Sequence, residues 1–270
     1  MTTTTGRPRF GTLLKEWRQR RRLSQLDLAL AAGVSSRHLS FIETGRSRPS
    51  AAMVLQLAER LEVPLRDRNA LLLAAGHAPV FEQHELEEPE MGPVRDAIER
   101  LLRGHEPFPA IVVDRHWGLV SANRAVPILI AGSAPELLEP PVNVMRLTLH
   151  PDGLAPRIAN LAEWRTHLLD RLRRQAIASG DPALLALYEE LLGYPSAAPT
   201  VVPDLEGGAI AVPFRLVVEG RELSFISTAT TFGTAVDVTL SELRIESFFP
   251  ADETTGAFLR ERASGDVEAR

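Results

Sequence analysis

The segment from residue 33 to residue 50, GVSSRHLSFIETGRSRPS, carries a high density of hydrogen-bonding side chains. Its hydroxyl and guanidinium groups can bond to phosphate oxygens and to the edges of nucleic-acid bases. Few large apolar side chains stand between them, so the segment has one face for packing and one for contacts with a partner. The polar side chains that carry this chemistry are Ser35, Ser36, Arg37, Ser40, Arg46 and Arg48.

Short helices are predicted on both sides of this segment. Phe10, Leu14 and Trp17 recur with the spacing of an amphipathic helix, and the basic run 18–22 suits its carboxyl end. A second helix is predicted to begin at Ser24, because Asp27 stands three residues later, as in a capping box. That helix is predicted to end at a glycine.

The next signals predict three more helices within the first 76 residues. Ser35 or Ser36 can cap a helix that ends near Gly45, and Ser50 can cap a fourth. Residues 66–76 form a fifth amphipathic stretch. The second and third helices, joined at Gly33, have the layout of a helix-turn-helix.

This layout predicts a division of roles within the third helix. Val34, Leu39 and Ile42 face inward, and the hydroxyls and Arg37 face the major groove of double-stranded DNA. Gln25 begins the preceding helix and can reach a phosphate, and the two arginines of the following loop can neutralise the backbone. Glu43 is expected to brace the domain instead of reading a base.

The distribution of charge agrees with a polyanion-binding first third. Residues 1–80 contain 13 lysines and arginines against 6 acidic residues, whereas the remainder contains 17 against 29. The net charge of −5 hides this asymmetry. A basic head on an acidic body indicates a nucleic-acid-binding module joined to a second module.

The first third resembles the helix-turn-helix of the XRE (lambda-repressor-like) regulators over residues 10–76. Many landmarks occur in order within LSQLDLALAAGVSSRHLSFIETGRSRPSAAMVLQLAERLEVP. The resemblance implies a five-helix domain that binds double-stranded DNA. A helical head that docks a protein is the alternative.

The second part begins after the glutamate-rich stretch 82–92, which predicts a linker. Residues 110–123 have the pattern of two strands or of a strand and a turn, and residues 161–195 that of two helices with a break. Residues 209–232 predict strands around a turn at Glu219–Gly220, and 235–250 a final strand. The predicted domains are 1–80, an acidic linker 81–93, a second domain 94–253 and a flexible tail 254–270.

Taken together, the motifs resemble regulators that carry an MmyB-like ligand-binding domain. The matching stretches include PAIVVDRHWGLVSAN, NVMRLTLHPDGLAPRIANLAEW and GDPALLALYEELLGYP. The resemblance implies a PAS-like domain, an antiparallel sheet with helices packed around a pocket. It also implies a small apolar effector, fatty-acid-like, and otherwise no cofactor.

Candidate pocket residues are of two kinds. Bulky aromatic side chains can line an alkyl-binding pocket, and polar side chains can hold a carboxylate at its mouth, arginine best of all. The alternative is that the aromatics are core, the asparagine is a helix cap and the arginines pair with surface acids. The candidates are Trp117, Trp164, Phe214, Phe225 and Phe232, with Asn143, Arg146, His150 and Arg157.

Other classes of function find little support. There is no nucleophile elbow, HExxH, P-loop or paired-acid signature, so neither a catalytic site nor a metal site is predicted. The absence of cysteine and of an apolar run long enough for a bilayer agrees with a cytoplasmic protein that does not insert in membranes. A homodimer is expected, since one recognition helix reads few base pairs. Two alternatives remain: a second domain that only dimerises, and a lipid or small-molecule carrier.

Overall fold

The computed structural model describes residues 9–195 and 211–268, which form two compact units. The first unit contains residues up to Glu85 together with the segment Thr234–Ser241. The second contains Leu86–Gly233 and Glu242–Arg270. The division after Glu85 lies within the predicted linker 81–93, and the short segment Thr234–Ser241 of the second half belongs to the first unit.

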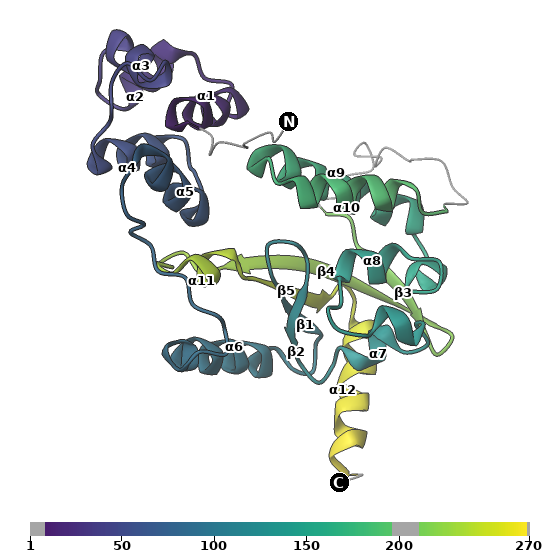
Figure 1. Cartoon of the computed structure of the whole chain (residues 1–270). Helices are drawn as coiled ribbons and strands as arrows, with labels where there is room; N and C mark the ends of the chain where they lie inside the picture. The colour runs from purple at the N-terminus through teal and green to yellow at the C-terminus, as the bar shows by residue number, and fades with distance from the viewer. Residues whose placement is uncertain (1–8, 196–210, 269–270) are drawn as a thin grey trace, which may run out of the picture. The chain divides into compact units, whose positions relative to one another are not determined.

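The first unit is a bundle of five short helices, as the capping signals predict (Figure 1). Ser24 forms a full capping box with Asp27, Ser35 accepts a hydrogen bond from the His38 amide, and Ser50 accepts one from the Met53 amide. Gly33 has φ +63°, which a glycine adopts without strain, and it joins the second and third helices. The helices are α1 Phe10–Arg20, α2 Gln25–Ala31, α3 Ser36–Glu43, α4 Ala51–Arg60 and α5 Leu65–Ala75.

The core of this bundle comes from the predicted apolar stripes. Leu14 and Trp17 of α1 pack with Leu39 and Ile42 of α3, and all four are at most 4% exposed. The inward face of α3 is thus used for packing, and its other face is left for a partner.

The second unit is built on an antiparallel five-stranded sheet in the order β2-β1-β5-β4-β3. The turn between β3 and β4 lies at Glu219–Gly220, as predicted, and both residues have positive φ. The strands are β1 Ala110–Val113, β2 Leu119–Ala122, β3 Phe214–Val218, β4 Arg221–Thr231 and β5 Arg244–Pro250.

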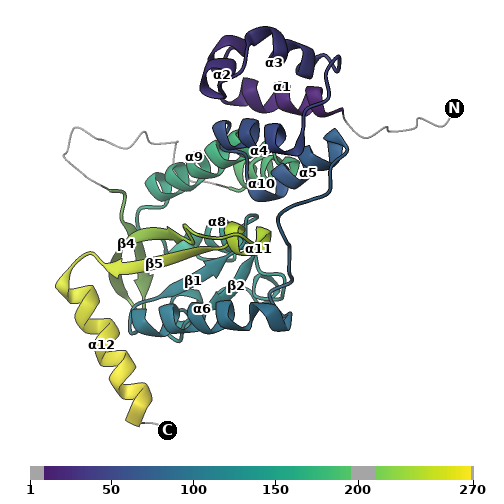
Figure 2. The same ribbon diagram turned by 90° about the vertical axis from the view of Figure 1, so that its left-hand side faces the viewer.

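Helices cover both sides of this sheet. Figures 1 and 2 show α8, α9 and α10 on one side and α6 on the other. The break between α9 and α10 falls at Gly180–Asp181, where Asp181 caps α10. The α-helices of this part of the chain are α6 Gly92–His105, α7 Pro127–Ile130, α8 Val144–Leu149, α9 Leu161–Ser179 and α10 Pro182–Leu192. Short 3-10 helices lie at Pro89–Met91, Pro135–Leu137 and Ala155–Arg157.

Two predictions about the last third are wrong. Residues 235–250 are not one strand, because Asp237 accepts a hydrogen bond from the Leu240 amide and starts the helix α11, Val238–Glu242, before β5. The tail is not a flexible extension either. It forms α12, Glu253–Glu268, which buries Phe258 and Leu259.

Candidate functional site

The outer face of α3 and the loop after it carry the predicted DNA-contacting side chains. Ser35, Arg37, Arg46 and Arg48 are exposed, while Ser36 and Ser40 are half-buried. The guanidinium groups of Arg37 and Arg46 lie over the ring of Phe41, at 5.4 and 5.9 Å from its centre. A cation over an aromatic face loses some of its freedom, so Phe41 holds two positive charges on this face. The sequence analysis missed this role of Phe41.

A buried ion pair fixes this face to the first helix. Arg18 Nε donates to Glu43 Oε1 at 2.7 Å, and Arg18 Nη2 donates to Glu43 Oε2 at 2.9 Å. Burial alone would raise the pKa of Glu43, but the bonds from Arg18 and Gln25 prevail and lower it. Glu43 therefore braces the domain, in agreement with its predicted role.

The side chain of Gln25, which the sequence predicted to reach a phosphate, is hydrogen-bonded within the domain. Its Nε2 donates to Glu43 Oε2 at 2.8 Å, so the carboxamide is tied to the brace. Because Gln25 begins α2, its position at the amino end of that helix is as predicted. The phosphate contact itself stays a prediction.

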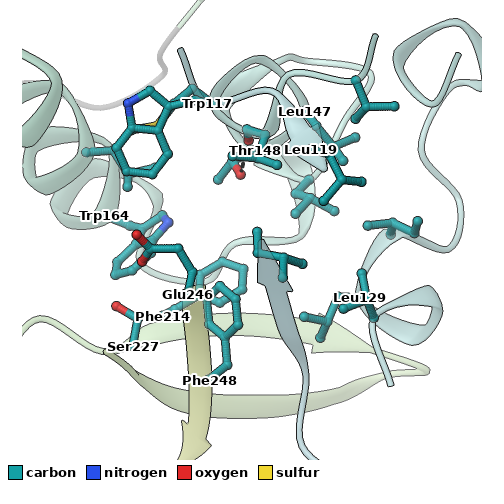
Figure 3. Close-up of a pocket in the computed structure, with 18 of the residues that line it drawn as sticks. Trp117, Leu119, Leu129, Leu147, Thr148, Trp164, Phe214, Ser227, Glu246 and Phe248 are labelled. Carbon is teal, nitrogen blue, oxygen red and sulfur yellow. Dashed lines mark hydrogen bonds between the residues drawn. The ribbon is translucent and has the colours of Figure 1, made fainter. Parts of the chain in front are cut away.

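The second unit contains an apolar cavity of about 180 Å³ between the sheet and its covering helices (Figure 3). Most of its wall is aliphatic, with Leu119, Leu129 and Leu147 lying together on one side in Figure 3. The aromatic residues Trp117, Trp164, Phe214 and Phe248 complete the wall. The other lining residues are Ile111, Val126, Ile130, Leu138, Val142, Val144, Met145, Thr148, Leu154, Leu168, Arg171, Ser227 and Glu246.

Trp117 is held in a strained conformation at the turn between β1 and β2. Its φ is +67°, which bulky side chains rarely adopt, and such strain persists only where surrounding contacts impose it. Asp114 accepts hydrogen bonds from the amides of His116 and Gly118, and Trp117 Nε1 donates to Gln175 at 2.9 Å. The indole is thus fixed as a wall of the cavity.

Charged groups line the cavity beside this indole. Arg171 donates from both Nη atoms to Glu246, at 3.1 and 2.5 Å, and its guanidinium lies 4.7 Å from the centre of the Trp117 ring. Arg244 lies over the same ring at 5.4 Å. Burial and the nearby Arg171 lower the pKa of Arg244. Arg171 is therefore paired with Glu246, and Arg244 stands over the same indole ring.

Comparison with known proteins identifies both units. The family described as "Helix-turn-helix" matches residues 14–67, and the "MmyB-like transcription regulator ligand binding domain" matches residues 94–261, which is more than half of the chain. The chain belongs to the MmyB-like transcription regulators. Its two matched regions are those of a helix-turn-helix and of a ligand-binding domain.

One curated relative of this MmyB-like regulator is itself described as a helix-turn-helix regulator. The chain is 39% identical over 82 residues to "Uncharacterized HTH-type transcriptional regulator RghRB" of Bacillus subtilis (strain 168). The match covers 30% of this chain and 57% of that protein. The likeness thus concerns one part of each chain.

The structure divides the predicted pocket residues of this regulator into two groups. Trp117, Trp164 and Phe214 line the cavity, as predicted. Phe225 is fully buried in the core, where its ring packs near Phe214, and Phe232 is half-buried just after β4. Neither of these last two lines the cavity.

None of the four polar candidates lines the cavity. Asn143 caps α8, and Arg146 pairs with Glu190 at 2.8 Å on the surface. His150 packs against Tyr194, and Arg157 donates to the Leu129 carbonyl at 2.7 Å. Their hydrogen-bonding capacity is largely used to hold helices and loops in place.

The charged lining residues Arg171 and Glu246 were missed by the sequence reasoning. The available signal was Glu246 itself, an acidic residue next to Ile245 in a strand that also carries Phe248 and Phe249. No local pattern links it to Arg171, which stands 75 residues earlier.

Residues 82–84 and 237–239 form a set of contacts that we call the clasp. The Val238 amide donates to the Glu82 carbonyl at 2.9 Å, and Thr239 Oγ1 donates to the His84 carbonyl at 2.7 Å. The His84 amide and ring Nδ1 lie 3.2 and 3.0 Å from Asp237 Oδ2. The clasp therefore ties the chain that follows the helical bundle to the segment that joins β4 to β5.

Other kinds of site find no support in the described part of the chain. In residues 9–195 and 211–268, no group of three or more histidine, aspartate or glutamate side chains is arranged to hold a metal ion. Nor does any helix within these ranges have the length and apolarity to cross a bilayer.

Proposed function

We propose that this regulator acts in the cytoplasm as a homodimer whose PAS-like second unit senses a small apolar, fatty-acid-like effector. The observation that carries the proposal is the apolar cavity in the same chain as a helix-turn-helix. An aliphatic wall favours an alkyl chain, since burial of apolar surface is the main driving force available there. The antiparallel sheet with helices around the cavity supports the PAS-like assignment.

The head binds double-stranded DNA through the outer face of α3. Ser35, Ser36, Arg37 and Ser40 read base edges, while Arg46 and Arg48 contact phosphates. One such face reads few base pairs, so two copies on a two-fold operator supply the affinity and the specificity. The exposure of the three arginines supports this division.

The clasp offers a route by which the effector alters DNA binding. Ser227 of β4 and Glu246 of β5 both line the cavity, and the segment that joins these strands is held by residues 82–84. An effector that binds one arrangement of these strands better than another shifts the population of that arrangement. Without such a difference in affinity, the effector switches nothing.

Two experiments test the proposal. The first measures the retardation of a fragment of the protein's own upstream DNA at several salt concentrations; we expect binding that weakens steeply with salt. A protein that does not bind DNA at any salt concentration would instead be the carrier with a docking head.

The second experiment extracts the purified, denatured protein with solvent and identifies released molecules by mass spectrometry. In parallel, the extracted and refolded protein is titrated with sodium decanoate. A stoichiometric aliphatic acid in the extract, or saturable decanoate binding, agrees with the sensor. An empty extract together with no decanoate binding contradicts it and favours a second unit that only dimerises.

A further inference from the structure

The indole nitrogen of Trp164 is a buried donor that no described residue accepts from. Trp164 is 4% exposed and lines the cavity, and its Nε1 has no hydrogen-bond partner among the described residues. Buried polar groups are almost always paired, so an unpaired one at the wall of a cavity marks a place for a ligand atom.

Three other polar side chains of the cavity wall have partners within the protein. Trp117 Nε1 donates to Gln175, Thr148 Oγ1 donates to the Val144 carbonyl at 2.6 Å, and Arg171 is paired with Glu246. These groups are satisfied by the protein. A donor left over in the same wall therefore points to an acceptor supplied from outside.

The position of this donor is well defined. Phe214 packs against the Trp164 indole with ring centres 5.0 Å apart, and His167 stacks on it at 5.3 Å. A ring held by two aromatic neighbours presents its N–H in one direction, so the donor is preorganised and a ligand does not have to order it.

The cavity has a polar side and an aliphatic side. Figure 3 shows Trp164, Glu246 and Ser227 near one another, while Leu119 and Leu129 lie across the cavity from them. This arrangement suits a ligand with an oxygen-bearing head and an alkyl tail.

The charge beside the polar side selects the kind of head. Arg171 and Arg244 both lie over the Trp117 ring, and the carboxylate of Glu246 is paired with Arg171. No hydrogen bond or ion pair to the Arg244 guanidinium occurs within the described residues. The surplus positive charge favours an anionic head over a neutral one.

We propose that Trp164 Nε1 donates a hydrogen bond to the carboxylate of an aliphatic acid whose chain lies along the aliphatic side of the cavity. The inference rests on the proposed ligand-sensing function and adds to it the residue that selects an acid. Trp164, and not the surface arginines at 146 and 157, then recognises the head.

The test compares the full chain with the variant Trp164→Phe by calorimetric titration, using sodium octanoate, sodium decanoate and decan-1-ol. Phenylalanine keeps an aromatic ring between Phe214 and His167 but removes the N–H. The matched control is Trp17→Phe, the same substitution in the core of the helical bundle, which should leave all three affinities unchanged. Circular dichroism checks that each variant is folded.

We expect Trp164→Phe to weaken decanoate binding by about 10-fold or more, because hydrogen bonds to charged groups are among the stronger ones. Its effect on decan-1-ol should be several times smaller. In the unchanged protein, decanoate should bind more tightly than octanoate, by up to about 4-fold per methylene.

The alternative outcomes separate this inference from the proposed function. If affinity rises with chain length but Trp164→Phe binds decanoate as well as the unchanged protein does, the cavity binds aliphatic acids and the inference is overturned. Equal losses for the acid and the alcohol would overturn the anionic head. If no ligand binds to the unchanged protein, the proposed function fails first.

A second measurement does not depend on the variant binding ligand. In protein labelled with ¹⁵N-tryptophan, the Trp164 indole signal is assigned by its absence from the Trp164→Phe spectrum. Decanoate should move this signal to the higher proton frequency of a hydrogen-bonded N–H. An unmoved signal at saturating decanoate overturns the proposal.

Discussion

Arg46→Ala is predicted to reduce both the affinity for DNA and its dependence on salt. Arg46 is exposed, and its guanidinium lies over Phe41 at the end of the DNA-contacting face. Each phosphate contact contributes a slope of about −0.9 to a plot of log affinity against log salt. A dimer loses two contacts, so the slope should become shallower by about 1.8. The same term predicts a loss of about 60-fold near 0.1 M salt and about 20-fold near 0.2 M.

The assay is fluorescence anisotropy with the upstream DNA fragment at five or more salt concentrations. The matched control is Arg100→Ala, which removes an exposed arginine of α6 outside the helix-turn-helix. The reasoning is refuted if Arg46→Ala leaves the slope unchanged, or if Arg100→Ala lowers it as much. A loss of affinity without a change of slope means that Arg46 contacts something other than a phosphate.

Three further predictions concern stability and the coupling between the units. Glu43→Gln should destabilise the helical bundle by about 3 kcal/mol at pH 7, because it leaves a buried guanidinium without its counter-ion. The folded-state pKa of Glu43 lies below its unfolded value of 4.5, so the Arg18–Glu43 pair stabilises the bundle above pH 4.5 and this stabilisation is lost as the pH falls further. The melting temperatures of the unchanged protein and of Glu43→Gln should therefore converge in acid. Asp237→Asn weakens the clasp at His84 and should reduce the effect of decanoate on DNA affinity while decanoate still binds. The control is Asp252→Asn, at the start of α12. If decanoate changes the DNA affinity of Asp237→Asn as much as that of the unchanged protein, the clasp does not couple the effector to DNA binding. Gly118→Ala should lower the melting temperature of the second unit by several degrees, because the added Cβ would stand 2.5 Å from Asp114 Oδ2. An unchanged calorimetric transition would show that the turn between β1 and β2 adapts to the added methyl group.

The helical bundle could be predicted from the sequence because its signals are local. Ser24, Ser35 and Ser50 act on amides three residues later, so a cap is visible in four letters of sequence. The inward stripe of α1 is visible for the same reason. The brace by Glu43 was also inferable, although its partner Arg18 stands 25 residues earlier.

The two wrong predictions of secondary structure concern segments whose overall sequence pattern differs from the structure that individual side chains impose. Residues 235–250 alternate like a strand, but Asp237 starts a helix by accepting the Leu240 amide, and the two signals compete within a few residues. In the polar tail, Asp252 accepts from the Thr255 amide, and two apolar side chains, Phe258 and Leu259, are enough to fix α12.

The residues that line the cavity could be predicted from the sequence only in part. Trp117, Trp164 and Phe214 were predictable as bulky side chains on elements that must pack together. Arg146 and Arg157 do not line the cavity, because Arg146 pairs with Glu190 on the surface and Arg157 donates to the Leu129 carbonyl. Which arginine of a covering helix meets an acid of the sheet depends on the tertiary packing, and no spacing in the chain encodes it.

The most direct test of the account is the affinity of the full-length, ligand-free protein for its upstream DNA fragment, with and without saturating sodium decanoate. The account predicts salt-dependent DNA binding whose dissociation constant changes at least several-fold when decanoate binds. An unchanged dissociation constant, with decanoate shown by calorimetry to occupy the cavity, would contradict the claim that the second unit controls the first.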